Sequence, residues 1–501
     1  MKMKMKRLVF LILTMLLVVS TIASCGENTA VNNDTSTKET NADASNSDSG
    51  DKTDDGLSAQ ETTNNLDIYN DNLQEQDFSG AQFRIAARDE PWLYVIYDSQ
   101  EENGDLINDA VYKRNRKIEE RFNIVITQDT LEDVSGPLKK NVKSGVDAYE
   151  LYLPVDREAL NFGADGTVYK ISDLPNVDLT KPYWSQSLNE CLTIGGDLYF
   201  AYGAFNLSVY DYTHVLLFNK QMMADLGLEN LYNTVRSGEW TFDKYAEMAR
   251  AATKDFNGNG VIGDDGDIFG LVSMDKHVLP CFWIGAGVQA ISKSEDDIPQ
   301  FNLRTDEKFA SVIDKIFDIT YGNNSRYCYT GELTEDKTIY LIDGYTLFAD
   351  ASFKGISDLR SIETDFGIIP YPKYTADQTN YYTRVEGGNP AVVPVTSLDT
   401  QMIGTILEAL NSEGAKTVIP AYYDVTLKTK HARDEESAQM LDLIFDGRIY
   451  DLGDTYWCSV LRDGIFLNMY SKNDRALASQ LEKVEPKINS EIDKVVKALN
   501  K

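Results

Sequence analysis

The sequence predicts an α/β protein, and its first folded segment carries the clearest signs of this class. Residues 82–87 alternate between polar and apolar side chains, as a half-buried strand does. A helix is expected over 106–122, where apolar side chains recur on one face and Asp105 can cap the first turn. Residues 123–126 form the next expected strand. Strand, helix and strand in this order predict a βαβ unit and a parallel sheet.

Length and charge limit the possible classes of protein. The chain has 501 residues, of which 42% are hydrophobic, so it can bury the cores of about two or three domains. Its formal net charge of −31 argues against binding to nucleic acid, whose phosphates need Lys and Arg. The same charge argues against electrostatic attachment to anionic lipid.

The N-terminus has the pattern of an export signal over residues 1–24. Lysines and an arginine precede an apolar run of about 16 residues, which is shorter than the roughly 20 that span a bilayer. Small residues and Cys25 follow, and this pattern resembles a bacterial lipobox, in which the cysteine takes a diacylglycerol and becomes the first mature residue. An ordinary cleaved signal or an uncleaved anchor is the alternative. We predict an exported lipoprotein, anchored through Cys25 to the outer face of the cytoplasmic membrane.

Residues 25–65 are expected to be a disordered tether. This stretch is rich in Asn, Asp, Ser and Thr and contains no aromatic residue and no proline. Such a composition cannot bury enough apolar area to offset the entropy of ordering the chain. As a flexible coil it would span roughly 35 Å and hold a folded part away from a membrane.

Further elements follow along the chain. A strand is expected over 149–154, and residues 214–220 predict a strand that runs straight into a helix ending near Leu226. Thr241 is expected to cap another helix, and Trp240 just before it is assigned to the core.

The tail has a regular pattern of its own. Apolar residues recur every three or four positions over 477–499 and predict a helix, in which Pro486 should introduce a kink. We expect this helix to pack across part of the fold.

The cysteines leave two alternatives open. Apart from Cys25, they are widely spaced and form no zinc signature. An exported chain permits disulfides, and four cysteines allow three pairings, but buried free thiols fit equally well. The four are Cys191, Cys281, Cys328 and Cys458.

Several short segments, taken in order, resemble the extracellular solute-binding proteins of bacterial ABC importers, a group that includes many sugar-binding lipoproteins. The resemblance covers roughly residues 80–470. It rests, besides the lipobox, on Asn103-Gly104-Asp105 with Asn108-Asp109-Ala110-Val111, Leu217-Phe218-Asn219-Lys220, Gly238-Glu239-Trp240-Thr241, the loop at Asp255, residues 366–373, and residues 419–425 with Leu427 and Lys428.

This resemblance implies an architecture and a function. The fold would be a type II periplasmic-binding-protein-like fold, with two α/β lobes joined by a hinge that the chain crosses several times. Lobe one would comprise 66–212 and 387–432, lobe two 213–386 and 433–465, and residues 466–501 a C-terminal helical segment. The protein would be a monomeric receptor that captures a carbohydrate, by preference an oligosaccharide, between its lobes and delivers it to the permease subunits of an ABC transporter.

A loop in the middle of the chain matches part of a calcium-binding pattern. Oxygen ligands at alternate positions can converge on one hard cation, and a glycine permits the sharp turn. Position 12 is Gly266 instead of a bidentate Glu, so we expect modest affinity for a structural Ca²⁺. An Asx turn without metal is the alternative. The candidate ligands are Asp255, Asn257, Asn259, the carbonyl of Val261, and Asp265 or Asp267.

Candidate solute contacts come from loops that follow strands or lie near the expected hinge. In open α/β sheets, ligands lie outside the carboxyl ends of the strands. Sugars are recognised by flat aromatic faces together with carboxylates, amides and arginine. Core packing for each aromatic residue, and solvation for each charge, are the alternatives. The candidates are Arg88, Asp89, Trp92, Asp156, Arg157, Tyr183, Trp184, His277, Trp283, Asp350, Phe353, Glu386 and Asn389.

Catalysis is the main competing class. The sequence has three histidines and no GxSxG, HExxH or P-loop motif. A glycosidase needs only two carboxylates, so a chain with 79 acidic residues always offers candidate pairs. We predict a binding protein without enzymatic activity. A glycoside-acting enzyme, a receptor for another solute such as a peptide, and a surface adhesin are the alternatives.

Overall fold

The computed structural model describes residues 67–260, 262, 266–321, 341, 343–359, 364–427 and 435–499. Cys25, the export signal and the tether lie outside these residues, as do Val261 and Asp265. The described strands are β1 (Ala81–Arg88), β2 (Ile124–Leu131), β3 (Leu151–Leu153), β4 (His214–Asn219), β5 (Phe269–Val272), β6 (Ser292–Lys293), β7 (Pro299–Gln300), β8 (Thr346–Ser352), β9 (Phe366–Ile369), β10 (Thr383–Arg384) and β11 (Arg448–Ile449).

Helices separate most of these strands, which confirms the predicted α/β class. They are α3 (Leu106–Phe122), α4 (Ser135–Ser144), α5 (Asp156–Ala164), α6 (Gln186–Leu192), α7 (Ser208–Asp211), α8 (Lys220–Asp225), α9 (Leu231–Arg236), α10 (Phe242–Ala252), α11 (Asp275–Gly285), α12 (Glu307–Tyr321), α14 (Phe353–Asp358), α15 (Thr400–Leu427), α16 (Glu435–Asp446), α17 (Leu467–Ser471) and α18 (Leu477–Leu499). Short 3₁₀ helices lie at 67–69 and 171–173, and a short π-helix lies at 462–466.

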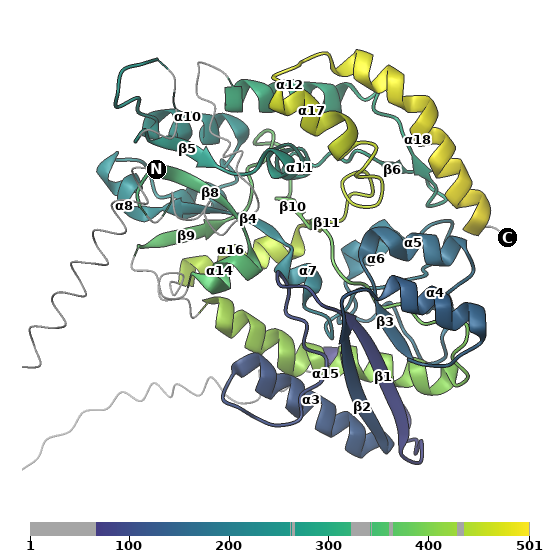
Figure 1. The fold of residues 1–501 in the computed structure, drawn as a ribbon. Helices are drawn as coiled ribbons and strands as arrows, with labels where there is room; N and C mark the ends of the chain where they lie inside the picture. The colour runs from purple at the N-terminus through teal and green to yellow at the C-terminus, as the bar shows by residue number, and fades with distance from the viewer. Residues whose placement is uncertain are drawn as a thin grey trace, which may run out of the picture. The chain divides into compact units, whose positions relative to one another are not determined.

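The first sheet has the order β2-β1-β3, and both of its strand pairs are parallel. Helix α3 connects β1 to β2, so the predicted βαβ unit is confirmed, and α15 lies alongside α3 (Figure 1). The expected strand over 149–154 is shorter than predicted and covers Leu151–Leu153. The second strand extends further than predicted, to Leu131, because β1 pairs with it over its whole length.

Helix α3 begins where the sequence places it. The Asp105 side chain accepts hydrogen bonds from the backbone N–H groups of Ile107 and Asn108, both at 3.0 Å. The helix ends at Asn123, whose φ of 49° is the left-handed conformation that asparagine tolerates at helix ends. These two polar residues mark where α3 begins and ends, whereas its apolar residues Ile107, Val111 and Ile118 form the buried face.

The second sheet is mixed and has the order β5-β8-β4-β9. Strand β4 is antiparallel to both of its neighbours, whereas β5 and β8 are parallel. All six residues of β4 are buried, as expected of a strand that is covered on both faces. Thr241 caps α10 and Trp240 is fully buried, so both predictions are confirmed.

Within the described residues, the chain crosses between the sheets in at least two segments. The first crossing segment, 208–214, leads from α7 into β4, and the second, 383–394, begins at β10. The N–H of Glu386 donates to the carbonyl of Tyr212 (3.1 Å), whereas further along the N–H of Val392 donates to Tyr152 in β3 (3.0 Å). The second crossing segment is therefore paired with the first crossing segment at its start and with the first sheet at its end. Strands β10 and β11 lie side by side here (Figure 1).

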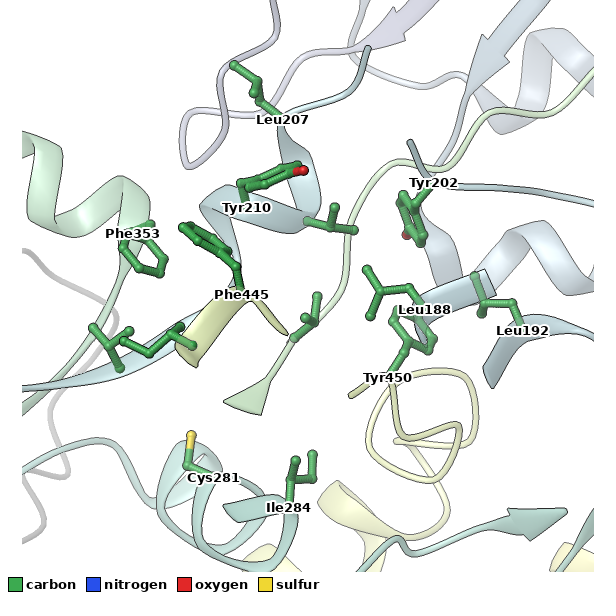
Figure 2. Packing of buried hydrophobic residues seen from close by; sticks show 14 of the residues in the cluster. Leu188, Leu192, Tyr202, Leu207, Tyr210, Cys281, Ile284, Phe353, Phe445 and Tyr450 are labelled. Carbon is green, nitrogen blue, oxygen red and sulfur yellow. The ribbon is translucent and has the colours of Figure 1, made fainter. Parts of the chain in front are cut away.

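Aromatic side chains pack around these crossings (Figure 2). The rings of Tyr210 and Phe445 have centroids 5.2 Å apart, and Phe353 stacks on Phe445 at 4.7 Å. Tyr202 and Tyr450 approach each other at 6.1 Å. Since such pairs add to the effect of burial, the backbone that crosses between the sheets is itself part of the core.

The C-terminal helix α18 confirms the predicted span, and Pro486 lies inside it. It contacts α5 and β7, and its buried residues include Leu481, Ile488 and Ile492. Figure 1 shows its C-terminal end next to α5. Glu485 pairs with Arg304, and the Tyr199 hydroxyl donates to the carbonyl of Leu499 (3.4 Å). The tail thus contacts segments that lie far apart in the sequence.

The described cysteines are unpaired with one another. Cys191, Cys281 and Cys458 are free thiols, and Cys281 and Cys458 are buried. Cys328 lies outside the described residues. Among the described helices, none combines the length and the apolar character needed to cross a bilayer.

We predict that replacing Asp105 by Ala lowers the free energy of unfolding by about 1 kcal/mol, because two N–H groups of the first turn lose their acceptor. Asp105→Asn keeps an acceptor and should cost only about 0.3 kcal/mol. Chemical denaturation of both variants measures the difference. Equal losses in the two variants would contradict the capping role.

Candidate functional site

A cluster of polar side chains, three of them buried and one partly exposed, lies where the second crossing segment meets the second sheet. We call His214, His277, Asp350 and Glu386 the central cluster. The Nδ1 atoms of His214 and His277 each lie 2.9 Å from a different oxygen of Asp350. Their Nε2 atoms lie 3.1 Å and 3.3 Å from the same oxygen, Oε2, of Glu386. The two imidazoles therefore bridge two carboxylates.

The fold brings these four residues together from four different elements. His214 is the first residue of β4, and Asp350 lies in β8, which pairs with β4 in antiparallel register. His277 lies in the first turn of α11, and Glu386 follows β10 in the second crossing segment. Sequence analysis included three of the four among its candidates but did not predict their contact.

The charges in the central cluster depend on each other. Burial by itself would lower the pKa of His214, but the neighbouring Cys281 and Asp350 raise it well above its ordinary value. Burial by itself would raise the pKa of Glu386, but His277 and Arg384 hold it well below its ordinary value. The Tyr371 hydroxyl donates to Asp350 at 2.8 Å.

An arginine–carboxylate network continues from the central cluster. Arg384 is fully buried and donates through Nε to Asp454 (2.6 Å), and its Nη1 lies 3.2 Å from Nε2 of His214. Arg462 donates to the carbonyl of Asp454 (2.9 Å). Two arginines thus share one buried aspartate, and the network ties β10 to the segment after β11.

Sequence analysis missed Arg384, Asp454 and Arg462. Arg384 and Asp454 are 70 residues apart, so no local spacing signals their contact. The sequence signal was weak, because Arg384 stands between Thr383 and Val385 in a segment that also contains Glu386. Burial of such a charge requires a partner, but the sequence does not show which acidic residue supplies it.

The loop after β1 carries the most accessible of the aromatic candidates. Trp92 is 46% exposed, Asp89 is exposed, and Arg88 pairs with Glu90 at 2.7 Å. The N–H of Tyr94 donates to Asp211 (2.6 Å), which fixes this loop to the first crossing segment.

Asp156 and Arg157 begin α5 and differ in burial. Arg157 is exposed, whereas Asp156 is buried and accepts a hydrogen bond from the hydroxyl of Tyr450. The N–H of Asp156 donates to the carbonyl of Gly388 in the second crossing segment (3.0 Å). This aspartate therefore joins α5 to two segments near the crossings.

The other aromatic candidates are buried and have partners within the fold. Tyr183 and Trp184 both donate to Glu408 of α15, and Trp283 donates to Asp451 at 3.0 Å. These three rings present no accessible face in this structure. Phe353 is fully buried against Phe445, and the N–H of Asn389 donates to Ser208 (3.0 Å). Their surroundings match the core-packing alternative of the sequence analysis.

The Asp255 loop is partly described. Asp255 accepts hydrogen bonds from the N–H groups of Gly258 (2.7 Å) and Gly260 (2.8 Å), and Asn257 accepts one from the N–H of Asn259 (2.9 Å). Asp267 is buried and accepts from the N–H of Phe256 (2.8 Å). The side-chain oxygens thus lie on the inner side of a tight turn, a geometry compatible with an Asx turn and with a cation loop.

Comparison with known proteins identifies the fold. No family profile matches the sequence. No curated protein matches it either.

Many solved structures resemble the fold. UgpB from Mycobacterium tuberculosis, in complex with glycerophosphocholine, has a TM-score of 0.54 and 15% identity over 82% of this chain and 99% of its own. The galacto-N-biose-/lacto-N-biose I-binding protein of a Bifidobacterium longum ABC transporter has a TM-score of 0.52 and 13% identity over 82% of this chain and 99% of its own. An ABC substrate-binding protein from Listeria monocytogenes, bound to cycloalternan, has a TM-score of 0.51 and 12% identity over 83% of this chain and 99% of its own. The chain has the two-lobe, periplasmic-binding-protein-like fold, as predicted.

We predict that Asp156 makes stability depend on pH. Burial raises the pKa of Asp156 to about 6, above the value of about 4 for an unfolded chain. Between these two pH values the folded state binds more protons than the unfolded state. The stabilising contribution of Asp156 to the free energy of unfolding is therefore fully present below about pH 4 and is lost as the pH rises through 6. The loss amounts to about 3 kcal/mol.

Asp156→Asn should remove this part of the pH dependence, because the amide keeps an acceptor for Tyr450 but does not titrate. Urea denaturation between pH 4 and 7 measures the difference from the unsubstituted protein. The exposed Asp89→Asn variant is the control and should leave the profile unchanged. An Asp156→Asn profile as steep as that of the unsubstituted protein would refute this prediction.

Proposed function

We propose that the protein is an extracellular receptor that captures a carbohydrate, by preference an oligosaccharide, between its lobes and delivers it to the permease of an ABC importer. The observation that carries the proposal is the alignment of this fold with nearly the full length of ABC substrate-binding proteins. Two of these are described with saccharides, cycloalternan and lacto-N-biose. UgpB is described with glycerophosphocholine, so a test of this proposal should also include phosphodiester solutes.

The loop after β1 supports a solute contact at Trp92. An exposed indole next to an exposed carboxylate offers a flat apolar face for a pyranose ring and an acceptor for its hydroxyls. The hydrogen bond from Tyr94 to Asp211 holds this loop to the first crossing segment. A solute that contacts Trp92 and the other lobe would therefore act close to the segments that must change when the lobes close. Binding favours the closed arrangement by the difference in affinity between the two states.

The cellular setting is also proposed from the sequence. Cys25 would receive the lipid and residues 26–65 would tether the folded part at the membrane surface. The receptor would act as a monomer, with the permease as its protein partner. Release of an unchanged solute separates this function from that of a glycoside-acting enzyme.

We predict that a thermal-shift screen of the mature protein finds stabilisation by an oligosaccharide. A ligand at 100 times its dissociation constant adds about 2.7 kcal/mol to the free energy of unfolding. The panel contains mono- and oligosaccharides, glycerophosphodiesters and peptides, and chromatography after incubation shows whether the ligand is intact. Trp92→Ala should weaken binding of the stabilising saccharide at least about tenfold, since it removes the stacking face.

Phe256→Ala is the matched control, because Phe256 is an exposed aromatic residue in a different loop. It should leave the affinity unchanged. Stabilisation by a peptide or a phosphodiester alone would retain a receptor but refute the carbohydrate. Recovery of a cleaved saccharide would refute the receptor in favour of an enzyme.

We further propose a structural Ca²⁺ in the Asp255 loop, supported by its inward-facing oxygens. Addition of Ca²⁺ to chelator-treated protein should raise the melting temperature by a few degrees. Asp255→Ala should abolish this increase, because it removes the carboxylate at the first position of the loop. Differential scanning calorimetry with and without Ca²⁺ decides between the cation loop and the Asx turn. The ion is added at about 1 mM, which is roughly the dissociation constant of weak extracellular Ca²⁺ sites.

A further inference from the structure

We propose that His214, His277 and Asp350 hold a divalent transition-metal ion, with zinc as the test ion and Cys281 as the fourth ligand. One ligand atom from each of the first three residues lies within 4.8 Å of the others. All three side chains are buried. The proposal does not depend on the solute, and it assigns a structural role to the central cluster.

The positions of the ligand atoms are compatible with a zinc site. Zinc binds nitrogen and oxygen ligands at about 2.0–2.2 Å, so neighbouring ligands of a tetrahedral ion lie roughly 3.3 Å apart. Each Nδ1 lies 2.9 Å from an oxygen of Asp350. Because the two nitrogens contact different oxygens of Asp350, an ion held by both nitrogens and one carboxylate oxygen also requires the carboxylate to turn. The ligands come from β4, α11 and β8, whose packing limits larger movements.

Glu386 and Tyr371 provide the outer contacts that zinc sites require. In metal sites, the second nitrogen of a histidine ligand commonly donates its proton to a carboxylate, which fixes the tautomer. Oε2 of Glu386 lies within hydrogen-bond distance of Nε2 of His214 (3.1 Å) and forms an ion-pair contact with Nε2 of His277 (3.3 Å). With the proton of each ring on Nε2, both Nδ1 lone pairs are directed to the Asp350 side of the cluster. The Tyr371 hydroxyl orients Asp350 by a hydrogen bond of 2.8 Å.

The charge balance allows a dication. If both histidines donate to Asp350 and to Glu386, each ring carries two protons, and the two positive charges offset the two carboxylates. A divalent ion that displaces one proton from each ring and the thiol proton of Cys281 leaves the cluster with one net negative charge, because zinc binds the thiolate. Lys276, whose Nζ lies 3.6 Å from Oε1 of Glu386, is placed to offset this charge.

Arg384, whose Nη1 lies 3.2 Å from Nε2 of His214, is offset by Asp454 at 2.6 Å. Arg462 shares Asp454 but also pairs with Asp463 at 2.8 Å, so the two arginines face two aspartates.

Cys281 determines the class of metal. It follows His277 by four residues on α11, so both side chains lie on one face of the helix. Its Sγ lies 4.0 Å from Oδ1 of Asp350 but is not among the ligand atoms that all lie within 4.8 Å of one another. The Cys281 side chain must therefore move by about an ångström or more to complete a tetrahedral site. A set of two nitrogens, one oxygen and one sulfur favours zinc or a similar transition metal over Ca²⁺ and Mg²⁺, which prefer oxygen alone.

The test uses the mature protein after treatment with a chelator. Titration with Zn²⁺ should show one bound ion per chain by elemental analysis, together with an increase in melting temperature. His277→Gln and His214→Gln should each raise the dissociation constant by about 100-fold or more, because each loses a ligand. Tyr371→Phe, which removes only an outer contact, should raise it about tenfold.

Two controls separate this site from other metal-binding groups. Cys458→Ser removes a different buried thiol and should leave zinc binding unchanged. Asp255→Ala should also retain zinc binding while it loses the response to Ca²⁺. Failure of the saccharide screen would leave these results untouched, so the two proposals are tested separately.

Substitution with Co²⁺ keeps the proposal testable if the histidine variants do not fold. The unsubstituted protein should give the intense visible absorption of tetrahedral cobalt and a sulfur-to-cobalt charge-transfer band, which Cys281→Ser abolishes. A weak spectrum typical of octahedral oxygen coordination would overturn the proposal. Absence of stoichiometric Zn²⁺ in the folded, unsubstituted protein would overturn it equally, as would unchanged affinity in both histidine variants.

Discussion

The side chain of Asp350 in β8 is completely buried, so the packing of the second sheet depends on neighbours that offset its charge and satisfy its oxygens. An isolated charge at such a position would cost several kcal/mol, so each neighbour is constrained to satisfy it. His214, His277 and Tyr371 do so from three different elements. Because removal of any one leaves a buried acceptor without full compensation, the packing of β4, β8 and α11 is coupled through one side chain.

The same requirement governs the crossings. Arg384 is fully buried and depends on Asp454, while Asp156 depends on Tyr450. The first contact joins the second crossing segment to chain that follows β11, and the second joins that chain to the start of α5. Directional hydrogen bonds to a charged group hold the backbone in one arrangement more strictly than apolar contacts do. The crossings are therefore ordered parts of the core, and a change in the relative position of the lobes must preserve or exchange these particular contacts.

Local patterns predicted the fold well wherever one segment carries its own signal. The Asp105 cap, the span of α3 and the span of α18 follow from capping and apolar periodicity, which act within a few residues. The central cluster could not be predicted in the same way, because His214 and His277 meet Asp350 across 136 and 73 residues. Trp283 illustrates the limit for solute contacts. Its indole N–H is satisfied by Asp451, 168 residues away, and no nearby residue shows that the ring is enclosed.

The contacts of helix α18 limit how far the two lobes of the proposed receptor could close. It contacts both α5 and β7, and its Glu485 pairs with Arg304 on the exposed surface. An exposed ion pair contributes at most about 1 kcal/mol, so the pair itself is easily exchanged. The buried apolar face of α18 is a stronger constraint, because separating it from α5 or β7 would expose apolar area at about 25 cal/mol per Å². In the proposed receptor, a solute would have to supply this energy through its preference for the closed state, unless the helix slides over one of its partners. Closure that keeps both contacts of α18 is therefore the arrangement that a weakly bound solute of such a receptor would reach.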